Sequence, residues 1–243
     1  MPKEERYARQ IVIPNIGTGG QQQLEQARVL VIGCGGLGSP ILFYLAAAGV
    51  GTLGVADEDR VHLSNLNRQI LYTTKDLGHS KARMAMQRLR SLNPEVKVIP
   101  YEVRVLEENG PAMVQDYDLV VEASDNLETK DLINTLCVNA AIPLVWGAVQ
   151  RFEGQMGVYM PGHACRRCIF PTMPKPGTYP PPSKLGILGA TAGVIGTLQA
   201  MEALKIILGI GQPMTDHILV WDGLTYSFEV VAVEAAPDCA TCA

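Results

Sequence analysis

The sequence has little that would direct it to nucleic acid, to a membrane or to secretion. Its 20 basic and 24 acidic residues give a formal net charge of −4, so it lacks the basic field typical of nucleic-acid-binding proteins. Gly, Pro or a charge interrupts the apolar stretches before they reach the roughly 20 residues that a membrane-spanning helix needs. The opening residues 1–7 are polar and lack the apolar core of a secretory signal. We therefore expect a cytoplasmic protein with no nucleic-acid or membrane partner.

Hydrophobic residues make up 47% of the 243 positions, and charged residues only 18%. A chain of this size and composition can bury a substantial core. The sequence also lacks an internal repeat at a solenoid period, which argues against a repeat architecture. We expect one domain covering residues 1–243.

Strand and helix patterns alternate in the first part of the chain. The β-branched and apolar strands are separated by helical segments, which predicts a mostly parallel sheet covered on both faces, as in Rossmann-like α/β proteins. The expected strands are residues 28–32, 52–56, 96–101, 118–122 and 143–146, and the expected helices are residues 40–50, 80–92, 107–115 and 127–140.

The pattern changes after residue 146. We expect a strand at 155–160, a proline-rich loop at 171–182, a long apolar helix at 190–208, and strands at 217–221 and 227–233. These later strands are expected to extend the parallel sheet in antiparallel fashion. The chain thus divides into a nucleotide-binding half, about residues 1–150, and a second half, about residues 151–243.

A glycine-rich loop follows the first expected strand, with the sequence Gly33-Cys34-Gly35-Gly36-Leu37-Gly38. Its glycines allow a tight turn and a close approach of the backbone to phosphate at the next helix N-terminus. Asp57 lies about 20 residues further on, at the end of the second strand, where an acidic side chain can bind ribose hydroxyls. These features are compatible with NAD, a flavin or ATP.

A cationic pair beyond this loop favours a triphosphate. Arg68 lies in the segment 64–69, and Lys81 begins a helix. A triphosphate carries more charge than a pyrophosphate bridge and develops more as a bond to phosphorus breaks. The ordinary alternative is that both are solvated surface charges.

Two Cys-x-x-Cys pairs frame the second half of the chain. They are Cys165 with Cys168, and Cys239 with Cys242. Four thiolates in two pairs suit a tetrahedral structural zinc, and no corner is left open for a catalytic water. In a reducing compartment paired cysteines bind metal more often than they form disulfides. We expect a Zn²⁺ site that stabilises the protein and takes no part in catalysis.

Taken together, these motifs resemble the MoeB/ThiF/HesA adenylyltransferases, the bacterial relatives of ubiquitin-activating enzymes. The resemblance runs from about Arg6 to Cys242. It rests on the following segments: Arg6-Tyr7-x-Arg9-Gln10, the glycine loop, Asp57-x-Asp59, Ser64-Asn65-Leu66-x-Arg68-Gln69, Lys81, Ser124-Asp125-Asn126, both cysteine pairs, and Gly196-Thr197-Leu198-Gln199-Ala200-Met201-Glu202-Ala203.

The resemblance implies an enzyme that uses ATP to adenylate the C-terminal Gly-Gly carboxylate of a small ubiquitin-like sulfur-carrier protein, releasing pyrophosphate. It implies that the second half of the chain binds zinc and the carrier. It also implies a homodimer in which Arg9 enters the active site of the neighbouring subunit. The residues implied to face nucleotide or Mg²⁺ are Gly36, Asp57, Ser64, Asn65, Arg68, Lys81, Asp125 and Asn126, with Asp125 as the magnesium ligand.

One position departs from the family pattern. Many relatives have a cysteine in the loop before the last long helix, and some use it to form a covalent link to the carrier, whereas this chain has Pro182 there. We predict adenylation without a covalent thiol intermediate, and transfer of the acyl-adenylate to a separate sulfur donor or acceptor. Cys34 and Cys137 are expected to be small buried packing residues.

Two other functions remain open at this point. An NAD-dependent oxidoreductase is compatible with the glycine loop and Asp57, although Arg68, Lys81 and Asp125 argue against it. A non-catalytic scaffold could retain the fold to bind a carrier, but it would have no physical reason to keep these side chains. The sequence does not indicate which carrier or sulfur-transfer pathway is served.

Overall fold

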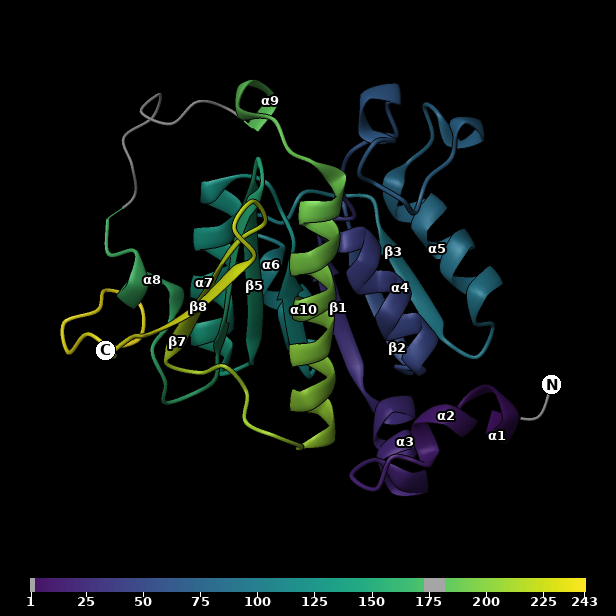
Figure 1. Ribbon diagram of the computed structural model, residues 1–243, viewed down its shortest axis with the longest axis horizontal. Coiled ribbons are helices and arrows are strands. Elements are labelled where there is room, and N and C mark those ends of the chain that lie inside the picture. Colours follow the sequence, from purple (N-terminus) through teal and green to yellow (C-terminus); the bar gives the residue numbers. More distant parts are fainter. Residues whose placement is uncertain (1–2, 173–181) are drawn as a thin grey trace.

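An eight-stranded sheet organises the described part of the chain, residues 3–172 and 182–243, in the computed structural model. The spatial order of the strands is β3-β2-β1-β4-β5-β6-β7-β8 (Figure 1). The strands are β1 (Arg28–Ile32), β2 (Thr52–Ala56), β3 (Lys97–Tyr101), β4 (Leu119–Glu122), β5 (Leu144–Gln150), β6 (Glu153–Tyr159), β7 (His217–Asp222) and β8 (Ser227–Ala232).

The first five strands are parallel, and β6, β7 and β8 each pair antiparallel with the strand before them. This confirms the expected sheet and its antiparallel extension. Strand β1 pairs with β2 on one side and with β4 on the other. The strand order therefore reverses between β1 and β4, and ligands of open α/β sheets bind at the carboxyl ends of strands at such a point.

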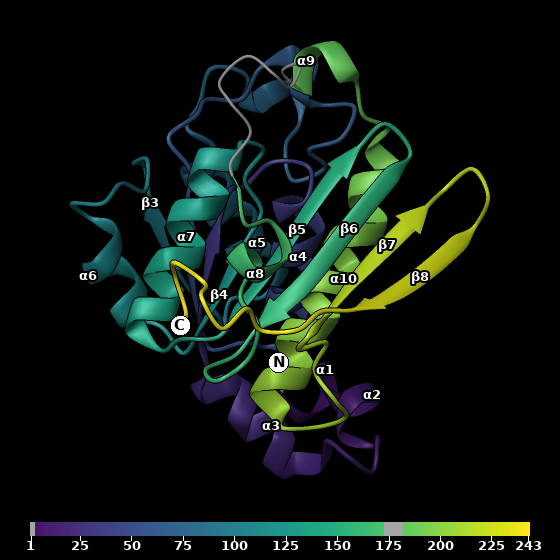
Figure 2. The ribbon, with the colours of Figure 1, turned by 90° about the vertical axis from the view of Figure 1, so that its left-hand side faces the viewer.

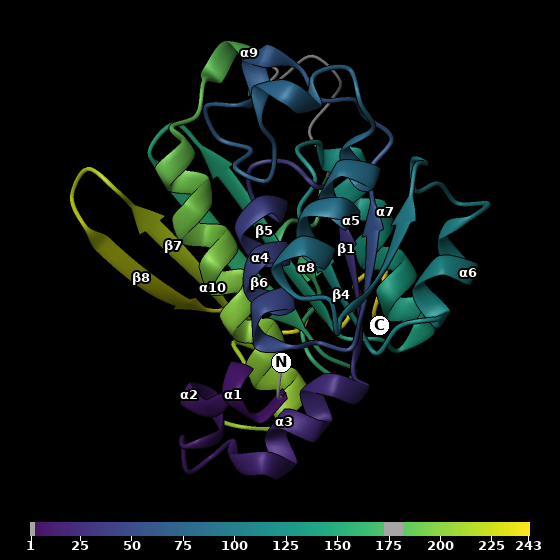
Figure 3. The same cartoon turned by 90° about the vertical axis from the view of Figure 1, so that its right-hand side faces the viewer.

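Helices cover both faces of the sheet. They are α1 (Lys3–Arg6), α2 (Ala8–Ile11), α3 (Gly17–Gln26), α4 (Gly38–Ala48), α5 (Lys81–Leu92), α6 (Gly110–Gln115), α7 (Leu127–Ala140), α8 (Arg166–Ile169), α9 (Pro182–Leu185) and α10 (Gly189–Leu208). Two single-turn 3₁₀ helices, Leu63–Asn65 and Thr74–Asp76, lie between β2 and α5. Helices α4, α5 and α10 lie on one face, and α6 and α7 on the other (Figures 2 and 3).

The alternation of side chains along the strands builds two cores. Val29 and Val31 of β1 belong to the core under α4, α5 and α10, whereas Leu30 and Ile32 belong to the core under α6 and α7. All four are buried, because successive strand residues point to opposite, covered faces of the sheet. Cys34 and Cys137 are buried, one in each core, as expected for packing residues.

The long apolar helix α10 packs across the face of the sheet and against α4. The expectation that every apolar stretch falls short of a membrane-spanning length is wrong for α10, the one helix in the described residues whose length and composition would suffice. About half of that stretch is buried inside the protein. Gly196 permits the close approach to α4, because a Cβ there would lie 2.6 Å from the Leu37 carbonyl oxygen and 2.6 Å from a carbon of Pro40. These contacts are those of a core helix.

The N-terminal helices α1 to α3 lie beside the amino ends of the parallel strands (Figure 1). Tyr7 is buried, and its hydroxyl accepts a hydrogen bond from Asn93 Nδ2 at 2.8 Å. The side chain of Gln10 donates to the carbonyl of Ala48 at the C-terminal end of α4. This segment is therefore fixed at the edge of the sheet opposite to the glycine loop.

The proline-rich loop expected at 171–182 falls mostly outside the described residues. The chain is described again from Pro182, which is the first residue of α9. Proline is well tolerated at the first position of a helix, because the N–H that it lacks would have no partner within the helix there.

Candidate nucleotide site and metal site

The glycine loop connects β1 to α4 at the point where the strand order reverses. Gly33 has a φ of +96°, and a Cβ there would lie 2.6 Å from the carbonyl oxygen of Ala123, just beyond β4. A Cβ on Gly38 would lie 2.0 Å from the carbonyl oxygen of Gly33. Glycine is therefore required at both positions for the loop to close against β4. The loop presents the N-terminus of the 11-residue helix α4, an arrangement that suits phosphate.

Asp57 follows β2 and is tied to this loop. Its carboxylate oxygens accept hydrogen bonds from the backbone N–H of Cys34 at 2.8 Å and of Asp59 at 2.9 Å. Burial raises the pKa of Asp57 above its ordinary value, while Lys81 and the two N–H donors oppose that shift. Each carboxylate oxygen can accept more than one hydrogen bond, so Asp57 retains capacity for ribose hydroxyls.

Lys81 begins α5 and is only 5% exposed. Its ammonium lies 2.9 Å from a carboxylate oxygen of Asp59, whose side chain is 64% exposed. The sequence alone did not reveal this pairing, although Asp59 belongs to the Asp57-x-Asp59 motif. The structure thus places a buried lysine next to Asp57, with a partner that is open to solvent.

Arg68 reaches the glycine loop from the segment between β2 and α5. A Cβ on Gly36 would lie 3.6 and 3.7 Å from the Cγ and Cδ atoms of Arg68. The guanidinium donates hydrogen bonds to the carbonyl of Ser64 at 2.9 Å and to the side chain of Asn67 at 3.1 Å. Arg68 is therefore held beside Gly36 by its own segment.

Ser64 and Asn65 take part in hydrogen bonds within this segment. Ser64 is exposed and supplies the carbonyl that binds Arg68. Asn65 Oδ1 accepts a hydrogen bond at 3.0 Å from the backbone N–H of His62. Gln69 ends the 64–69 motif but was given no role from the sequence. It is buried against Gly35, and its Oε1 has no hydrogen-bond partner among the described residues.

Asp125 and Asn126 follow β4, on the other side of the glycine loop. Asp125 is exposed, whereas Asn126 caps α7 by accepting a hydrogen bond from the backbone N–H of Thr129 at 2.8 Å. A hydrogen bond links the ends of β1 and β4 next to this turn, because the N–H of Ala123 donates to the carbonyl of Ile32 at 2.8 Å. An exposed carboxylate at this edge is the kind of ligand that Mg²⁺ takes together with nucleotide phosphates.

Arg9 is not brought to this group of residues. It is exposed on α2, in the segment that packs on the C-terminal end of α4, whereas the glycine loop lies at the N-terminal end of the same helix. A helix of this length spans about 16 Å. Arg9 therefore cannot face the glycine loop of its own chain in this arrangement.

The four cysteines of the two Cys-x-x-Cys pairs converge in one cluster, although 74 residues separate the paired thiols. The Sγ atoms of Cys165 and Cys239 are 3.7 Å apart, those of Cys168 and Cys242 are 3.5 Å apart, and all four lie within 4.8 Å of one another. A disulfide would bring two sulfurs to about 2.05 Å, whereas a tetrahedral zinc with bonds of about 2.3 Å would hold them about 3.8 Å apart. The cluster fits a four-thiolate zinc site.

Groups around the cluster donate hydrogen bonds to its sulfurs. Asn134 Nδ2 of α7 lies 3.6 Å from Cys165 Sγ, and the backbone N–H of Ala236 lies 3.4 Å from Cys168 Sγ. Donors of this kind favour the thiolate form that metals bind. Asn134 also accepts a hydrogen bond from the backbone N–H of Arg166 at 2.9 Å, so α7 is attached directly to the first Cys-x-x-Cys turn.

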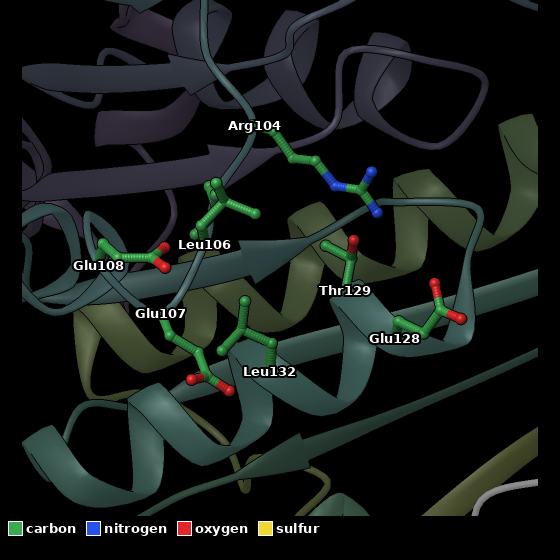
Figure 4. Close-up of a pocket in the computed structure, with 8 residues that line it drawn as sticks. Arg104, Leu106, Glu107, Glu108, Glu128, Thr129 and Leu132 are labelled. Atoms are coloured by element: carbon green, nitrogen blue, oxygen red, sulfur yellow. The ribbon is translucent and has the colours of Figure 1, made fainter.

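A surface hollow of about 340 Å³ lies elsewhere, between the segment after β3 and α7. Leu106 reaches it from that segment, and Thr129 and Leu132 reach it from α7 (Figure 4). Three glutamates, Glu107, Glu108 and Glu128, line it together with one cation, Arg104, so a triphosphate would meet a net negative lining there. None of the residues assigned to nucleotide lines this hollow.

Comparisons with known proteins agree with the sequence motifs and the fold. The sequence pattern of the ThiF family matches residues 7–241. The chain is 47% identical to a sulfur carrier protein adenylyltransferase of Thermus thermophilus, over 99% of this chain and 92% of that protein. It is 44% identical to the SAMP-activating enzyme E1 of Haloferax volcanii, over 98% of this chain and 88% of that protein.

A longer relative and a solved structure complete the comparison. Mouse adenylyltransferase and sulfurtransferase MOCS3 is 45% identical over 98% of this chain, which spans 52% of that protein. Among solved structures, E. coli MccB with MccA-N7isoASN superposes with a TM-score of 0.85 and 22% identity, covering 100% of this chain and 75% of MccB. At that identity the likeness concerns the fold alone.

Proposed function

The chain belongs to the ThiF family, and we propose that it uses ATP to adenylate the C-terminal carboxylate of a small ubiquitin-like sulfur-carrier protein ending in Gly-Gly, releasing pyrophosphate. The observation that carries this proposal is the grouping of the glycine loop, Asp57, Arg68 and Lys81 at one edge of the sheet, in a chain 47% identical to a sulfur carrier protein adenylyltransferase.

In this proposal the nucleotide lies across the glycine loop. Gly36 has no side chain to keep phosphate away from the backbone, and the N-terminus of α4 favours negative charge. Asp57 would accept hydrogen bonds from the ribose hydroxyls. Ser64 and Asn65 would line the site on the segment that also carries Arg68.

The reaction requires that the charge on the phosphates be neutralised and that the carboxylate be positioned next to the α-phosphorus. A C-terminal carboxylate has a pKa of about 3.5, so it is ionised at neutral pH and can attack the α-phosphorus without a general base. The bond between the α-phosphorus and the bridging oxygen then breaks, and pyrophosphate leaves. Arg68 and Lys81 would neutralise the charge that develops on the phosphate oxygens. Lys81 would exchange part of its contact with the exposed Asp59 for a phosphate oxygen.

Asp125 is the proposed ligand of Mg²⁺, with Asn126 beside it. A single carboxylate together with phosphate oxygens is a donor set that Mg²⁺ accepts, since the ion keeps several of its waters. When bound, the ion would offset phosphate charge. The chain's own contribution is to hold the Asp125 carboxylate at the edge of the glycine loop.

We propose a homodimer with shared active sites. Arg9 lies at the end of α4 opposite to the glycine loop, so the contribution that the family resemblance implies for it requires a second copy of the chain. The guanidinium of the neighbouring subunit would then add positive charge to the triphosphate.

The second half of the chain is proposed to bind structural zinc and the carrier. The four cysteines leave no open coordination position, so zinc there would stabilise the fold. By the family resemblance, Pro182 stands where many relatives have a cysteine that some of them link to the carrier, so the acyl-adenylate would pass to a separate sulfur donor or acceptor without a covalent intermediate on this enzyme. A carrier adduct that survives denaturation and disappears on reduction would contradict this last point.

Pyrophosphate release tests the proposed function. Purified protein is incubated with ATP, Mg²⁺ and each of a panel of small carriers that end in Gly-Gly, with matched carriers that lack the last two residues. We expect release with at least one intact carrier and none with its truncated form. Equal release with both forms would contradict adenylation of the tail. A nicotinamide-dependent change in absorbance would instead favour an oxidoreductase.

A further inference from the structure

A charged pair of side chains is buried next to the turn that carries Asp125. Glu122, the last residue of β4, has no exposed surface, and Lys130, in the first turns of α7, is 4% exposed. The Lys130 ammonium lies 2.6 Å from Glu122 Oε2 and 2.6 Å from the carbonyl oxygen of Gly147 in β5. The pair therefore ties both ends of the 122–130 segment to each other and to the neighbouring strand.

The same carboxylate also holds the turn itself. Glu122 Oε1 accepts a hydrogen bond from the backbone N–H of Ser124 at 2.7 Å and a second one from the Ser124 hydroxyl. At the far end of the turn Asn126 caps α7. Asp125 is thus an exposed residue between two neighbours that are both fixed by hydrogen bonds.

A third element packs on this arrangement. Gln199 of α10 is fully buried, and its Nε2 donates to the backbone carbonyl of Glu122 at 2.9 Å. A Cβ on Gly147 would lie 2.4 Å from Gln199 Oε1, so glycine is needed where Lys130 and Gln199 both approach β5. The end of β4 is held from α7, β5 and α10 together.

Stability is a weak explanation for such a pair. Removing two charges from water is costly, and apolar residues of similar volume often replace a buried ion pair without loss of stability. A buried pair can instead specify one arrangement of the groups around it. Here those groups are the Ser124–Asn126 turn and its only exposed carboxylate, Asp125, beside the glycine loop.

We infer that Lys130 is a positioning residue, which acts through Glu122 to place the Asp125 carboxylate where it binds the Mg²⁺ that accompanies the nucleotide. Lys130 itself does not touch substrate. This inference rests on the proposed function and deepens it, because it names the group that makes the metal-binding turn rigid. Family motifs mark Ser124, Asp125 and Asn126, whereas only the structure brings Lys130 to Glu122.

The test measures ATP binding by calorimetry in the presence and absence of Mg²⁺. In Lys130→Met we expect the Mg²⁺-dependent gain in ATP affinity to fall by about tenfold or more, as for other residues that orient metal ligands, with ATP affinity in the absence of Mg²⁺ little changed. Lys130→Arg keeps the positive charge and should keep the Mg²⁺-dependent gain in ATP affinity. Lys205→Met is the control, because it removes another lysine–glutamate pair, with Glu202, within α10.

A double variant separates positioning from stability. Lys130→Met alone leaves a buried Glu122 charge without its cation and lowers the melting temperature, whereas Glu122→Gln with Lys130→Met removes both charges. We expect the double variant to regain melting temperature but not the Mg²⁺-dependent gain. The inference would be overturned if either the folded double variant or Lys130→Met showed the same Mg²⁺-dependent gain in ATP affinity as the wild type. If the wild-type protein shows the Mg²⁺-dependent gain in ATP affinity but none of the carriers causes pyrophosphate release, the result would count against the proposed function and not against this inference.

Discussion

Arg68 and Lys81 come from different segments, and both are restrained by contacts within the protein. Lys81 is buried and paired with Asp59, and Arg68 donates to Ser64 and Asn67. An exposed partner such as Asp59 holds a lysine only weakly, because solvent screens the pair. Lys81 would therefore turn to a phosphate at small cost, while Arg68 is held beside Gly36 by the bonds within its own segment.

Replacement of Arg68 or Lys81 by alanine should lower the turnover of adenylation by about 100- to 1,000-fold, the usual cost of removing one donor that stabilises developing charge. The measurement is carrier-dependent pyrophosphate release at saturating ATP. Arg83→Ala is the matched control, since Arg83 lies on α5 close to Lys81 in sequence but is largely exposed and pairs with Glu102. Unchanged turnover in the Arg68 and Lys81 variants would remove both residues from the site.

Some of the site residues could be predicted from the sequence and others could not. Gly33, Gly38 and Asp57 follow strands at a spacing that only a few ligands explain, so the carboxyl edge of the sheet could be predicted. Glu122 and Lys130 gave no comparable signal, because a single lysine in a helix is usually solvated. Their pairing depends on packing between elements that are distant from any motif.

At the scale of elements, α7 connects the cysteine cluster to the turn after β4, beside the glycine loop. Its first turns carry Lys130, which holds the Ser124–Asn126 turn through Glu122, and one turn later Asn134 contacts Cys165 and Arg166. Residues four apart lie on the same side of a helix. One face of α7 therefore supports both sites.

Asn134→Ala should weaken metal binding at the cysteine cluster by about tenfold or more, because residues that orient metal ligands typically contribute this much to affinity. Competition with a chromogenic zinc chelator measures the effect. Thr135→Ala is the control, since among the described residues the Thr135 hydroxyl bonds only to the Asp131 carbonyl within the same helix. Equal zinc affinity in Asn134→Ala and wild type would show that this hydrogen bond does not tune the cluster.

The elements themselves were predicted unevenly. Apart from β5, which was expected at 143–146 but extends to Gln150, the strands and the long helices α5, α7 and α10 were predicted to within about two residues, whereas α3 was missed. Its sequence begins Gly-Thr-Gly-Gly, and glycine disfavours helix by about 1 kcal/mol per residue. Tertiary contacts compensate, because Leu24 is buried in the core and Gln21 donates to the carbonyl of Ala48.

For the whole molecule, the cysteine cluster joins the C-terminal segment to the turn after β6. The proposed zinc would restrict a long stretch of the unfolded chain, so its binding free energy would contribute to folding. Chelation should lower the melting temperature of the wild type, and Cys165→Ser should melt lower and lose its response to the chelator. Cys137→Ser, a buried cysteine outside the cluster, should keep the response. A wild-type melting temperature that does not change on chelation would contradict a structural metal.

The proposed dimer predicts that two inactive variants complement each other. Arg9→Ala and Arg68→Ala should each be nearly inactive alone. An exchanged one-to-one mixture should recover about a quarter of wild-type activity, since half of the dimers are mixed and each of these has one intact site in a two-fold arrangement. No recovery in a mixture shown to contain mixed dimers would mean that Arg9 does not serve the neighbouring subunit.

Isotope labelling of the carrier tests adenylation of its C-terminal carboxylate directly. A carrier with ¹⁸O in its C-terminal carboxylate is incubated with the enzyme, ATP and Mg²⁺, the acyl-adenylate is cleaved at its carbonyl carbon by an added thiol, and the AMP is analysed by mass spectrometry. If the carboxylate attacks the α-phosphorus, AMP carries one ¹⁸O from the carrier. AMP without the label, formed in the presence of an intact Gly-Gly tail, would show that the carboxylate is not adenylated and would contradict the proposed function.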